Sequence, residues 1–401
     1  MKIAYDENMP YAAQLFGQFG EVVCFAGRQC NAETVADADV LLVRSITKVN
    51  QTLLADASKL QFVGTATIGT DHISQQYLAS RGIAFHSAPG CNAISVGEYV
   101  LSAIKVLEQQ YLFNVVDKVV GVVGAGNTGS AVAKLLRALG VRVLLCDPPL
   151  ALAKRAASGR NCLDAERLDG DHVSIEYVDY KTVLQQADII SFHVPLVLDG
   201  EYPTVHLFGA NELATIKPDA MIINACRGEV IDNHALLAAK RAGNNNPLVL
   251  DVWEGEPQVL MPLIDYADIA TAHIAGYSFE GKARGTFMLY QALCQHLGVE
   301  PTVQLSDLLP TSAVFAASVE TPRTEVDLQL VSRLVHLSYD VRRDDGIFRQ
   351  HIAGNGFDWI RKNFPVRREF SAITVNGQPS ATLNALAELG FITRECEITG
   401  E

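Results

Sequence analysis

The sequence has no pair of cysteines at Cys-x-x-Cys spacing, although eight cysteines are scattered along its 401 residues. A disulfide framework or a cysteine-ligated zinc site usually shows cysteines at short, regular spacings, so neither is expected. No apolar run approaches the roughly 18 residues that a membrane-spanning helix needs. Residues 1–10 also lack the apolar core of a secretion signal. We therefore expect a globular protein of the cytoplasm with reduced thiols.

Basic residues are in the minority, with 32 Lys and Arg against 45 Asp and Glu and a formal net charge of −13. A surface of this charge repels phosphates, which argues against a nucleic acid or an anionic membrane as a partner. Any anionic ligand must therefore bind in a local basic pocket. The length and an apolar content of 49% suffice for two or three domains with cores of their own.

Short β-rich segments alternate with helical patterns, which is typical of parallel α/β folds. In the first part of the chain, strands are expected at residues 2–5, 21–25, 40–43 and 61–64, and helices at 10–17, 74–80 and 93–110. A second series of strands is expected at residues 118–123, 141–146, 188–193, 221–224, 248–251 and 269–272. Beyond Gly298 the pattern indicates a smaller α+β module, with strands at 312–319, 372–375 and 391–393 and helices at 328–339 and 381–389.

A glycine-rich turn, Gly124-Ala-Gly-Asn-Thr-Gly129, lies between an expected strand and a helix expected over residues 128–139. In such a turn Gly124 permits the tight bend, Gly126 lets the backbone approach a pyrophosphate, and Gly129 permits close helix packing. The helix N-terminus then faces the phosphates. The motif alone is weak, but its position between strand and helix predicts a dinucleotide site.

Asp147 follows the next expected strand, 18 residues after Gly129. A carboxylate there accepts hydrogen bonds from both ribose hydroxyls and repels a 2′-phosphate. The predicted cofactor is therefore NAD rather than NADP.

Three further residues, Arg227, Glu256 and His273, follow expected strands in the second half of the chain. Removing a hydride from a secondary alcohol requires a base for the hydroxyl proton, a group that orients this base, and a cation for a neighbouring carboxylate. An imidazole exchanges protons near neutral pH, and a carboxylate stabilises its charged form. The planar guanidinium of an arginine holds a carboxylate through two hydrogen bonds. We assign these roles to His273, Glu256 and Arg227 respectively.

The segments 224–228 (Asn-Ala-Cys-Arg-Gly), 251–257 (Asp-Val-Trp-Glu-Gly-Glu-Pro) and 273–276 (His-Ile-Ala-Gly) resemble the D-isomer-specific 2-hydroxyacid dehydrogenases. The resemblance implies that Arg227, Glu256 and His273 are catalytic. Further stretches, at residues 43–50, 64–72, 89–93, 146–149, 276–285 and 333–345, are similar to one member of this family whose substrate also carries a phosphate. The stretch 150–177 is longer than in that member, and the tail after Ser371 matches it less well.

The resemblance also implies binding residues, and it implies no metal. Those expected at the cofactor are Gly124, Gly126, Asn127, Thr128, Gly129, Asp147, Val194, Ala225, Cys226, Asp251 and Gly276. Those expected at the substrate are Ser45, Thr67 and Tyr277, and from its charge we add Arg44, with Lys48 as a second candidate for the phosphate.

The expected architecture is α/β, with a Rossmann-type NAD-binding domain over residues 96–256 and a flavodoxin-like substrate domain over 1–95 and 257–285. The resemblance implies that residues 286–401 form an α+β dimerisation domain of a homodimer. Two alternatives remain for the function. One is a related dehydrogenase of the 3-phosphoglycerate or hydroxypyruvate type, and the other is a non-catalytic NAD-sensing protein. A formate dehydrogenase is disfavoured because it is expected to have glutamine where Glu256 stands.

Overall fold

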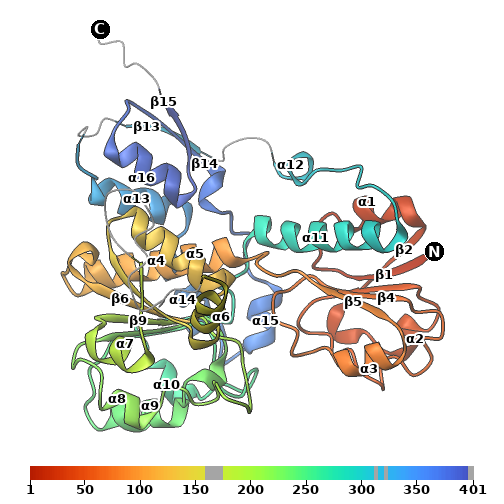
Figure 1. Cartoon of the computed structure of the whole chain (residues 1–401), viewed down its shortest axis with the longest axis horizontal. Helices are drawn as coiled ribbons and strands as arrows, with labels where there is room; N and C mark the ends of the chain where they lie inside the picture. Colours follow the sequence, from red (N-terminus) through yellow and green to blue (C-terminus); the bar gives the residue numbers. More distant parts are fainter. Residues whose placement is uncertain (159–174, 311–314, 320–323, 396–401) are drawn as a thin grey trace. The chain divides into compact units, whose positions relative to one another are not determined.

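The structure, a computed structural model, describes residues 1–158, 175–310, 315–319 and 324–395 (Figure 1). The chain forms two compact units, one of Met1–Ala93 with Tyr277–Ser312 and one of Ile94–Gly276 with Ala313–Glu401. The chain therefore crosses between the units three times. No helix in the described ranges combines the length and apolar character needed to cross a membrane.

The first unit contains a five-stranded sheet in the order β2-β1-β3-β4-β5, in which every pair of neighbours is parallel. Its strands are β1 (Lys2–Asp6), β2 (Glu21–Phe25), β3 (Val40–Val43), β4 (Phe62–Thr65) and β5 (Ala84–Ser87). Its helices include α1 (Ala12–Phe16), α2 (Ala32–Val35), α3 (Gln75–Ser80), α11 (Phe279–Leu297) and α12 (Leu305–Leu308). This strand order is that of flavodoxin-like folds, so the prediction for this region is confirmed.

Alternate residues of these strands enter two separate cores. Leu42 and Phe62 pack with α1 and α11 on one face of the sheet, whereas Leu41 and Val63 pack with Leu78 of α3 on the other. A parallel strand buried on both faces reads as a continuous apolar run, and this explains the Val-Leu-Leu-Val sequence of β3.

The second unit contains a seven-stranded parallel sheet in the order β12-β11-β10-β9-β6-β7-β8. Its strands are β6 (Val119–Val123), β7 (Arg142–Cys146), β8 (Ile175–Tyr177), β9 (Ile189–Phe192), β10 (Met221–Asn224), β11 (Leu248–Leu250) and β12 (Ile269–Ala270). Its helices include α4 (Ala93–Gln110), α5 (Asn127–Ala138), α6 (Pro148–Ser158), α7 (Tyr180–Gln186), α8 (Ala210–Leu213), α9 (Asn233–Arg241) and α10 (Met261–Ile264). The strand order reverses between β6 and β9, which is where Rossmann folds bind nucleotides. The predicted Rossmann-type fold is confirmed.

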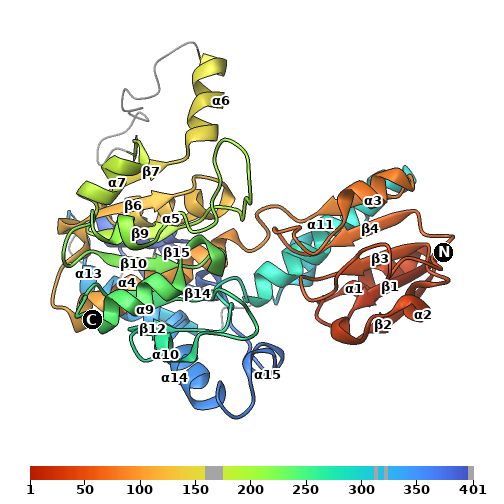
Figure 2. The same cartoon turned by 90° about the horizontal axis from the view of Figure 1, so that it is seen from below.

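The C-terminal residues form a three-stranded parallel sheet of β13 (Phe315–Val319), β14 (Ile373–Gly377) and β15 (Ile392–Glu395). The helices here are α13 (Leu328–Ser338), α14 (Val341–His351), α15 (Phe357–Lys362) and α16 (Ala381–Leu389). Figure 2 shows α14 beside β12, where Asp345 accepts a hydrogen bond from the amide of Ala270 (2.8 Å). The expected C-terminal α+β region is present, and part of it covers the edge of the large sheet.

The stretch 150–177, which is longer than in the related protein, begins within α6 and ends with β8. Residues 159–174 of that stretch lie outside the described residues. Several helices have no counterpart in the sequence-based prediction, and the longest of them are α6, α11 and α14.

Candidate active site

The three glycines of the turn after β6 meet different surroundings. Gly124 has a φ of +94°, and a Cβ there would lie 2.5 Å from the carbonyl oxygen of His193. A Cβ on Gly129 would lie 1.8 Å from the carbonyl oxygen of Gly124. By contrast, a Cβ on Gly126 would have no atom within 4 Å. The protein's own packing therefore requires Gly124 and Gly129, while the space beside Gly126 fits the pyrophosphate of a dinucleotide.

Asp147 lies directly after β7 and is tied to this turn. Its Oδ2 accepts a hydrogen bond from the amide of Ala125 (2.9 Å), and its Oδ1 accepts one from the amide of Leu150 (3.0 Å). Each carboxylate oxygen can accept a second hydrogen bond. The arrangement thus fits a ribose whose two hydroxyls donate to the carboxylate.

The remaining residues predicted at the cofactor follow neighbouring strands of the same sheet. Asn127 and Thr128 begin α5, Val194 comes two residues after β9, and Ala225 and Cys226 come directly after β10. Because carboxyl ends of parallel strands meet at one edge, the structure brings these residues to the edge where Gly124 lies. Burial raises the pKa of the Cys226 thiol to about 11, so this side chain is neutral.

Glu256 and His273 form a direct pair, with 2.8 Å between Oε2 of Glu256 and Nδ1 of His273. The other carboxylate oxygen of Glu256 accepts a hydrogen bond from the amide of Trp253 (2.9 Å). Burial raises the pKa of Glu256, but His273, the Trp253 amide and the charge of Arg361 outweigh this effect, and the net pKa is lowered. Glu256 is therefore ionised at neutral pH and favours the imidazolium form of its partner.

Residues 271–276 form a tight turn, here called the His273 turn. His273 has a φ of +56°, which is uncommon outside glycine. Its amide donates to the carbonyl of Asp251 (2.6 Å). The carboxylate of Asp251 accepts hydrogen bonds from the amides of Ile274 (2.8 Å) and Ala275 (2.9 Å) and from the hydroxyl of Thr271 (2.6 Å). Several bonds thus hold an unfavourable backbone conformation in place.

Asp251 was expected at the cofactor, and its surroundings show what it does within the protein. It is 1% exposed, and burial raises its pKa against the opposing effects of His273 and of the hydrogen bonds in the turn. Its carboxylate organises the backbone that carries His273.

Arg227 follows β10, and its Nη1 donates to the carbonyl of Cys226 (2.7 Å). The next residue, Gly228, abuts the segment that carries Glu256, because a Cβ on Gly228 would lie 2.0 Å from the carbonyl oxygen of Trp253. The indole of Trp253 in turn donates to the carbonyl of Thr271 (2.8 Å) in the His273 turn. Trp253 thus connects the three segments that carry Arg227, Glu256 and His273.

Gly228 and Trp253 were not assigned a role from the sequence. Both lie inside the segments that carry the family resemblance, but their importance depends on contacts between residues distant along the chain. Those contacts leave no local signal in the sequence.

The predicted substrate residues lie in the first unit and are called the Arg44 cluster: Arg44, Ser45, Thr67 and Tyr277. Arg44 follows β3 and is 9% exposed. Its guanidinium carbon lies 5.8 Å from the ring centroid of Tyr277, and the ammonium of Lys282 lies 4.7 Å from the same centroid. Thr67 donates to the carbonyl of Gly69 (2.9 Å), and Ser45 is exposed. The structure therefore brings Arg44 and Tyr277 together and adds Lys282, a cation that the sequence did not single out.

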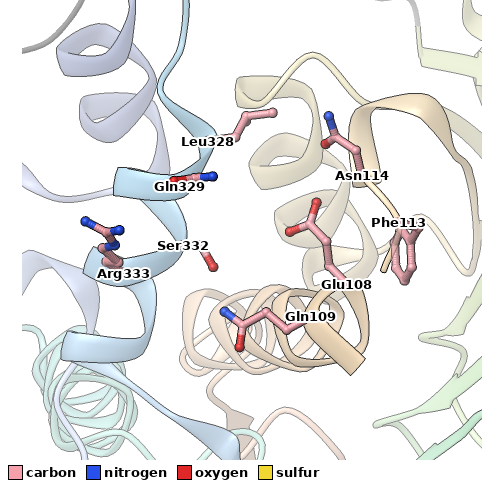
Figure 3. A pocket seen from close by; sticks show the side chains of 8 residues that line it. All are labelled: Glu108, Gln109, Phe113, Asn114, Leu328, Gln329, Ser332 and Arg333. Carbon is pink, nitrogen blue, oxygen red and sulfur yellow. The ribbon is translucent and has the colours of Figure 1, made fainter. Parts of the chain in front are cut away.

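Two other features of the second unit contain none of the predicted site residues. A pocket of about 460 Å³ lies between the C-terminal end of α4 and α13, where residues such as Glu108, Asn114 and Ser332 line it (Figure 3). No predicted site residue lines it.

The other feature, His206 with Asp232 and Glu254, groups three potential metal ligands of the described chain. Nε2 of His206 lies 2.7 Å from Glu254, whereas Nδ1 lies 4.0 Å from Asp232. The two carboxylates thus approach different nitrogens of the ring, an arrangement that does not suit a single metal ion.

Comparison with known proteins first defines a class. Residues 102–275 match the family model "D-isomer specific 2-hydroxyacid dehydrogenase, NAD binding domain", and residues 308–390 match a "Domain of unknown function (DUF3410)". The solved D-lactate dehydrogenase of Aquifex aeolicus, complexed with NAD and lactic acid, is 22% identical with a TM-score of 0.57, and the match covers 74% of this chain and 95% of that chain. The NAD-bound 3-phosphoglycerate dehydrogenase of Entamoeba histolytica is 20% identical with a TM-score of 0.60, covering 76% and 98%. These structures share the fold of an NAD-binding dehydrogenase.

More similar relatives narrow the assignment. The chain is 51% identical over 406 residues to the erythronate-4-phosphate dehydrogenase of Colwellia psychrerythraea, covering 98% of this chain and 99% of the relative. It is 52% identical over 392 residues to that of Aeromonas salmonicida, with the same coverage. The chain belongs to the family of erythronate-4-phosphate dehydrogenases.

Proposed function

We propose that the protein oxidises the C2 alcohol of 4-phospho-D-erythronate to 2-oxo-3-hydroxy-4-phosphobutanoate with NAD. The observation that most directly supports this activity is the hydrogen bond between Glu256 and His273. This pair lies in the same unit as the glycine turn after β6. The name of the relatives supports the substrate. With this activity we propose a role for the protein in pyridoxal phosphate (vitamin B6) synthesis.

The chemistry follows from the hydrogen bonds of the imidazole. Because Nδ1 of His273 donates to Glu256, its Nε2 presents a lone pair and takes the proton of the substrate hydroxyl. NAD, when bound at the glycine turn, would supply the acceptor for the hydride that leaves C2. Glu256 stabilises the resulting imidazolium, and the alcohol becomes a carbonyl. The guanidinium of Arg227 holds the substrate carboxylate and polarises the C2 oxygen.

The substrate also carries a phosphate, which needs cationic and hydroxyl groups in a chain of net charge −13. We assign the Arg44 cluster to substrate binding, with Arg44 at the phosphate. The first unit is then the substrate-binding unit, and the sheet of seven strands binds NAD.

The proposal includes a cytoplasmic homodimer. Cys24, Cys30, Cys91, Cys146, Cys226 and Cys294 are free thiols, as is usual in a reducing compartment. The family resemblance assigns dimerisation to the C-terminal residues, and sedimentation of the purified protein tests it.

The direct test is to incubate the purified protein with NAD and 4-phosphoerythronate and to follow the absorbance of reduced nicotinamide. A parallel sample contains a 2-oxo acid, so that turnover is detected even if the cofactor stays bound. The expected result is turnover by wild type and turnover slower by about two to four orders of magnitude in His273→Ala. Turnover of 3-phosphoglycerate or hydroxypyruvate instead would make the protein a sibling enzyme. NAD binding without turnover of any of the three would favour a sensing role.

A further inference from the structure

Arg367 is a buried cation between α15 and β14, 2% exposed. Its Nη1 donates to the carbonyl of Ala275 (2.9 Å), and its Nη2 donates to the carbonyl of Ser95 (2.7 Å). The same Nη2 lies 3.5 Å from the carboxylate of Glu98, which is also buried. The guanidinium carbon lies 3.5 Å from the ring centroid of Tyr339. A desolvated cation with this many partners is held in one orientation.

The two carbonyls that Arg367 binds lie next to places where the chain changes units. Ser95 comes one residue after Ile94, where the second unit begins, and Ala275 comes one residue before Gly276, where this part of it ends. The chain passes between the two units at three places. At two of them, the side chain of Arg367 holds the backbone that belongs to the second unit.

Ala275 also belongs to the His273 turn. Its amide donates to Asp251 and its carbonyl accepts from Arg367, so this part of the turn is held from both sides. Without Arg367, the bonds from Asp251 and from the indole of Trp253 still hold the turn, but the carbonyl of Ala275 loses its side-chain partner. The left-handed conformation of His273, with φ of +56°, then has less support.

Other C-terminal residues contact the same framework at different points. Phe348 of α14 stacks on Trp253, with ring centroids 5.5 Å apart, and both belong to the core of the large sheet. Arg349 binds the carbonyls of Ile264 (2.9 Å) and Ala267 (2.7 Å). Arg349 thus binds two carbonyls, as Arg367 does, but outside the His273 turn, and its side chain is 33% exposed and paired with Asp345 (2.9 Å). It serves as a control for the loss of a C-terminal cation.

We propose that Arg367 is a positioning residue for the dehydrogenase, acting through the backbone of the His273 turn and of Ser95. This inference rests on the proposed function. Arg367 lies in the segment that matches the domain of unknown function. The inference gives this segment a part in building the active site. The planar fork of arginine is required because it reaches two carbonyls at once, whereas the ammonium of lysine is a single point charge.

The test uses the full-length protein with Arg367→Met combined with Glu98→Gln, because removing the cation alone would leave a buried carboxylate uncompensated. We expect kcat to fall by about ten- to a hundred-fold. The dissociation constant of NAD should remain within about twofold, and Arg367→Lys should give an intermediate kcat. Arg349→Met should lower the melting temperature while leaving kcat per folded molecule within about twofold.

Hydrogen exchange provides a readout that does not depend on the substrate. Amides of the His273 turn should exchange at least about tenfold faster in the double variant and in Arg367→Lys than in wild type or Arg349→Met. Wild-type protein inactive on 4-phosphoerythronate contradicts the proposed function alone, and the exchange data still decide the role of Arg367. Active wild type with unchanged kcat and exchange in Arg367→Lys and in the double variant overturns the inference. If the double variant does not fold, Arg367→Lys alone decides in the same way.

Discussion

The His273 turn of the second unit and the Arg44 cluster of the first are built in different ways. In the turn, the backbone amides of residues 273–275 donate to Asp251, and the imidazole is paired with Glu256. In the cluster, Arg44 contacts an aromatic face and Ser45 is exposed. The group proposed to move a proton is thus fixed by hydrogen bonds to its ring and its backbone, whereas Arg44 of the proposed substrate site lies against an aromatic ring. Substitutions in the turn should mainly lower kcat, and those in the cluster should mainly change KM.

The largest effect is expected from His273→Ala, which removes the proposed base. We expect kcat to fall by about two to four orders of magnitude, with NAD binding retained because the glycine turn is untouched. Stopped-flow hydride transfer and titration with NAD measure the two quantities. His234→Ala, at an exposed position of α9, is the control and should behave as wild type. Near-native turnover in His273→Ala would remove the base assignment.

Glu256→Gln should have a smaller effect on rate and a distinct effect on pH dependence. The imidazole lowers the pKa of Glu256, and because the interaction is mutual, the carboxylate favours the protonated imidazole. In oxidation the base must be unprotonated, so loss of the Glu256 carboxylate should move the acidic limb of kcat/KM to lower pH. The maximal rate should fall by about tenfold or more. An unmoved limb would mean that another group sets the charge of His273.

The difference between these regions also shows how far the sequence determines the structure. The helix over 93–110 and the strand over 221–224 were predicted to the residue, because apolar periodicity and local propensity agree there. The Arg227, Glu256 and His273 segments were located through their motifs. That the latter two residues form a hydrogen bond needed the folded chain.

Two of the helices that were not predicted, α11 and α14, have local sequences that do not favour a helix. Helix α11 contains Gly281 and Gly285, which weaken a helix prediction. A Cβ on Gly285 would lie 3.0 Å from the carbonyl oxygen of Ala66, so this glycine permits close packing on the sheet. Five of the eleven residues of helix α14 are Asp or Arg, yet the helix buries Asp344 together with Phe348. Tertiary contacts override local propensity in both helices.

Gly126→Ala tests whether the space in the glycine turn is used by the cofactor. No protein atom lies within 4 Å of the added methyl group, so the melting temperature should change little. The KM for NAD should rise by about tenfold, since the methyl group obstructs the approach of the pyrophosphate. Gly346→Ala, which is also free of neighbours within 4 Å and lies in α14, is the matched control and should leave KM unchanged. An unchanged KM for NAD in Gly126→Ala would place the pyrophosphate elsewhere.

Arg44→Ala is expected to have an effect no larger than that of Gly126→Ala, because it acts on substrate affinity alone. Removing one cation from a phosphate site should raise the KM for 4-phosphoerythronate by about tenfold and leave that for erythronate nearly unchanged. Lys59→Ala, an exposed cation of the same unit, controls for the change in net charge.

If Arg44→Ala keeps the preference for the phosphorylated substrate, another cation must bind the phosphate. Lys282 beside Tyr277 and Lys48 would then be tested. A fall in the kcat of Arg44→Ala without a change in KM would contradict the proposed difference between the His273 turn and the Arg44 cluster. It would mean that Arg44 belongs to the preorganised machinery, because only interactions made in the transition state alter kcat alone.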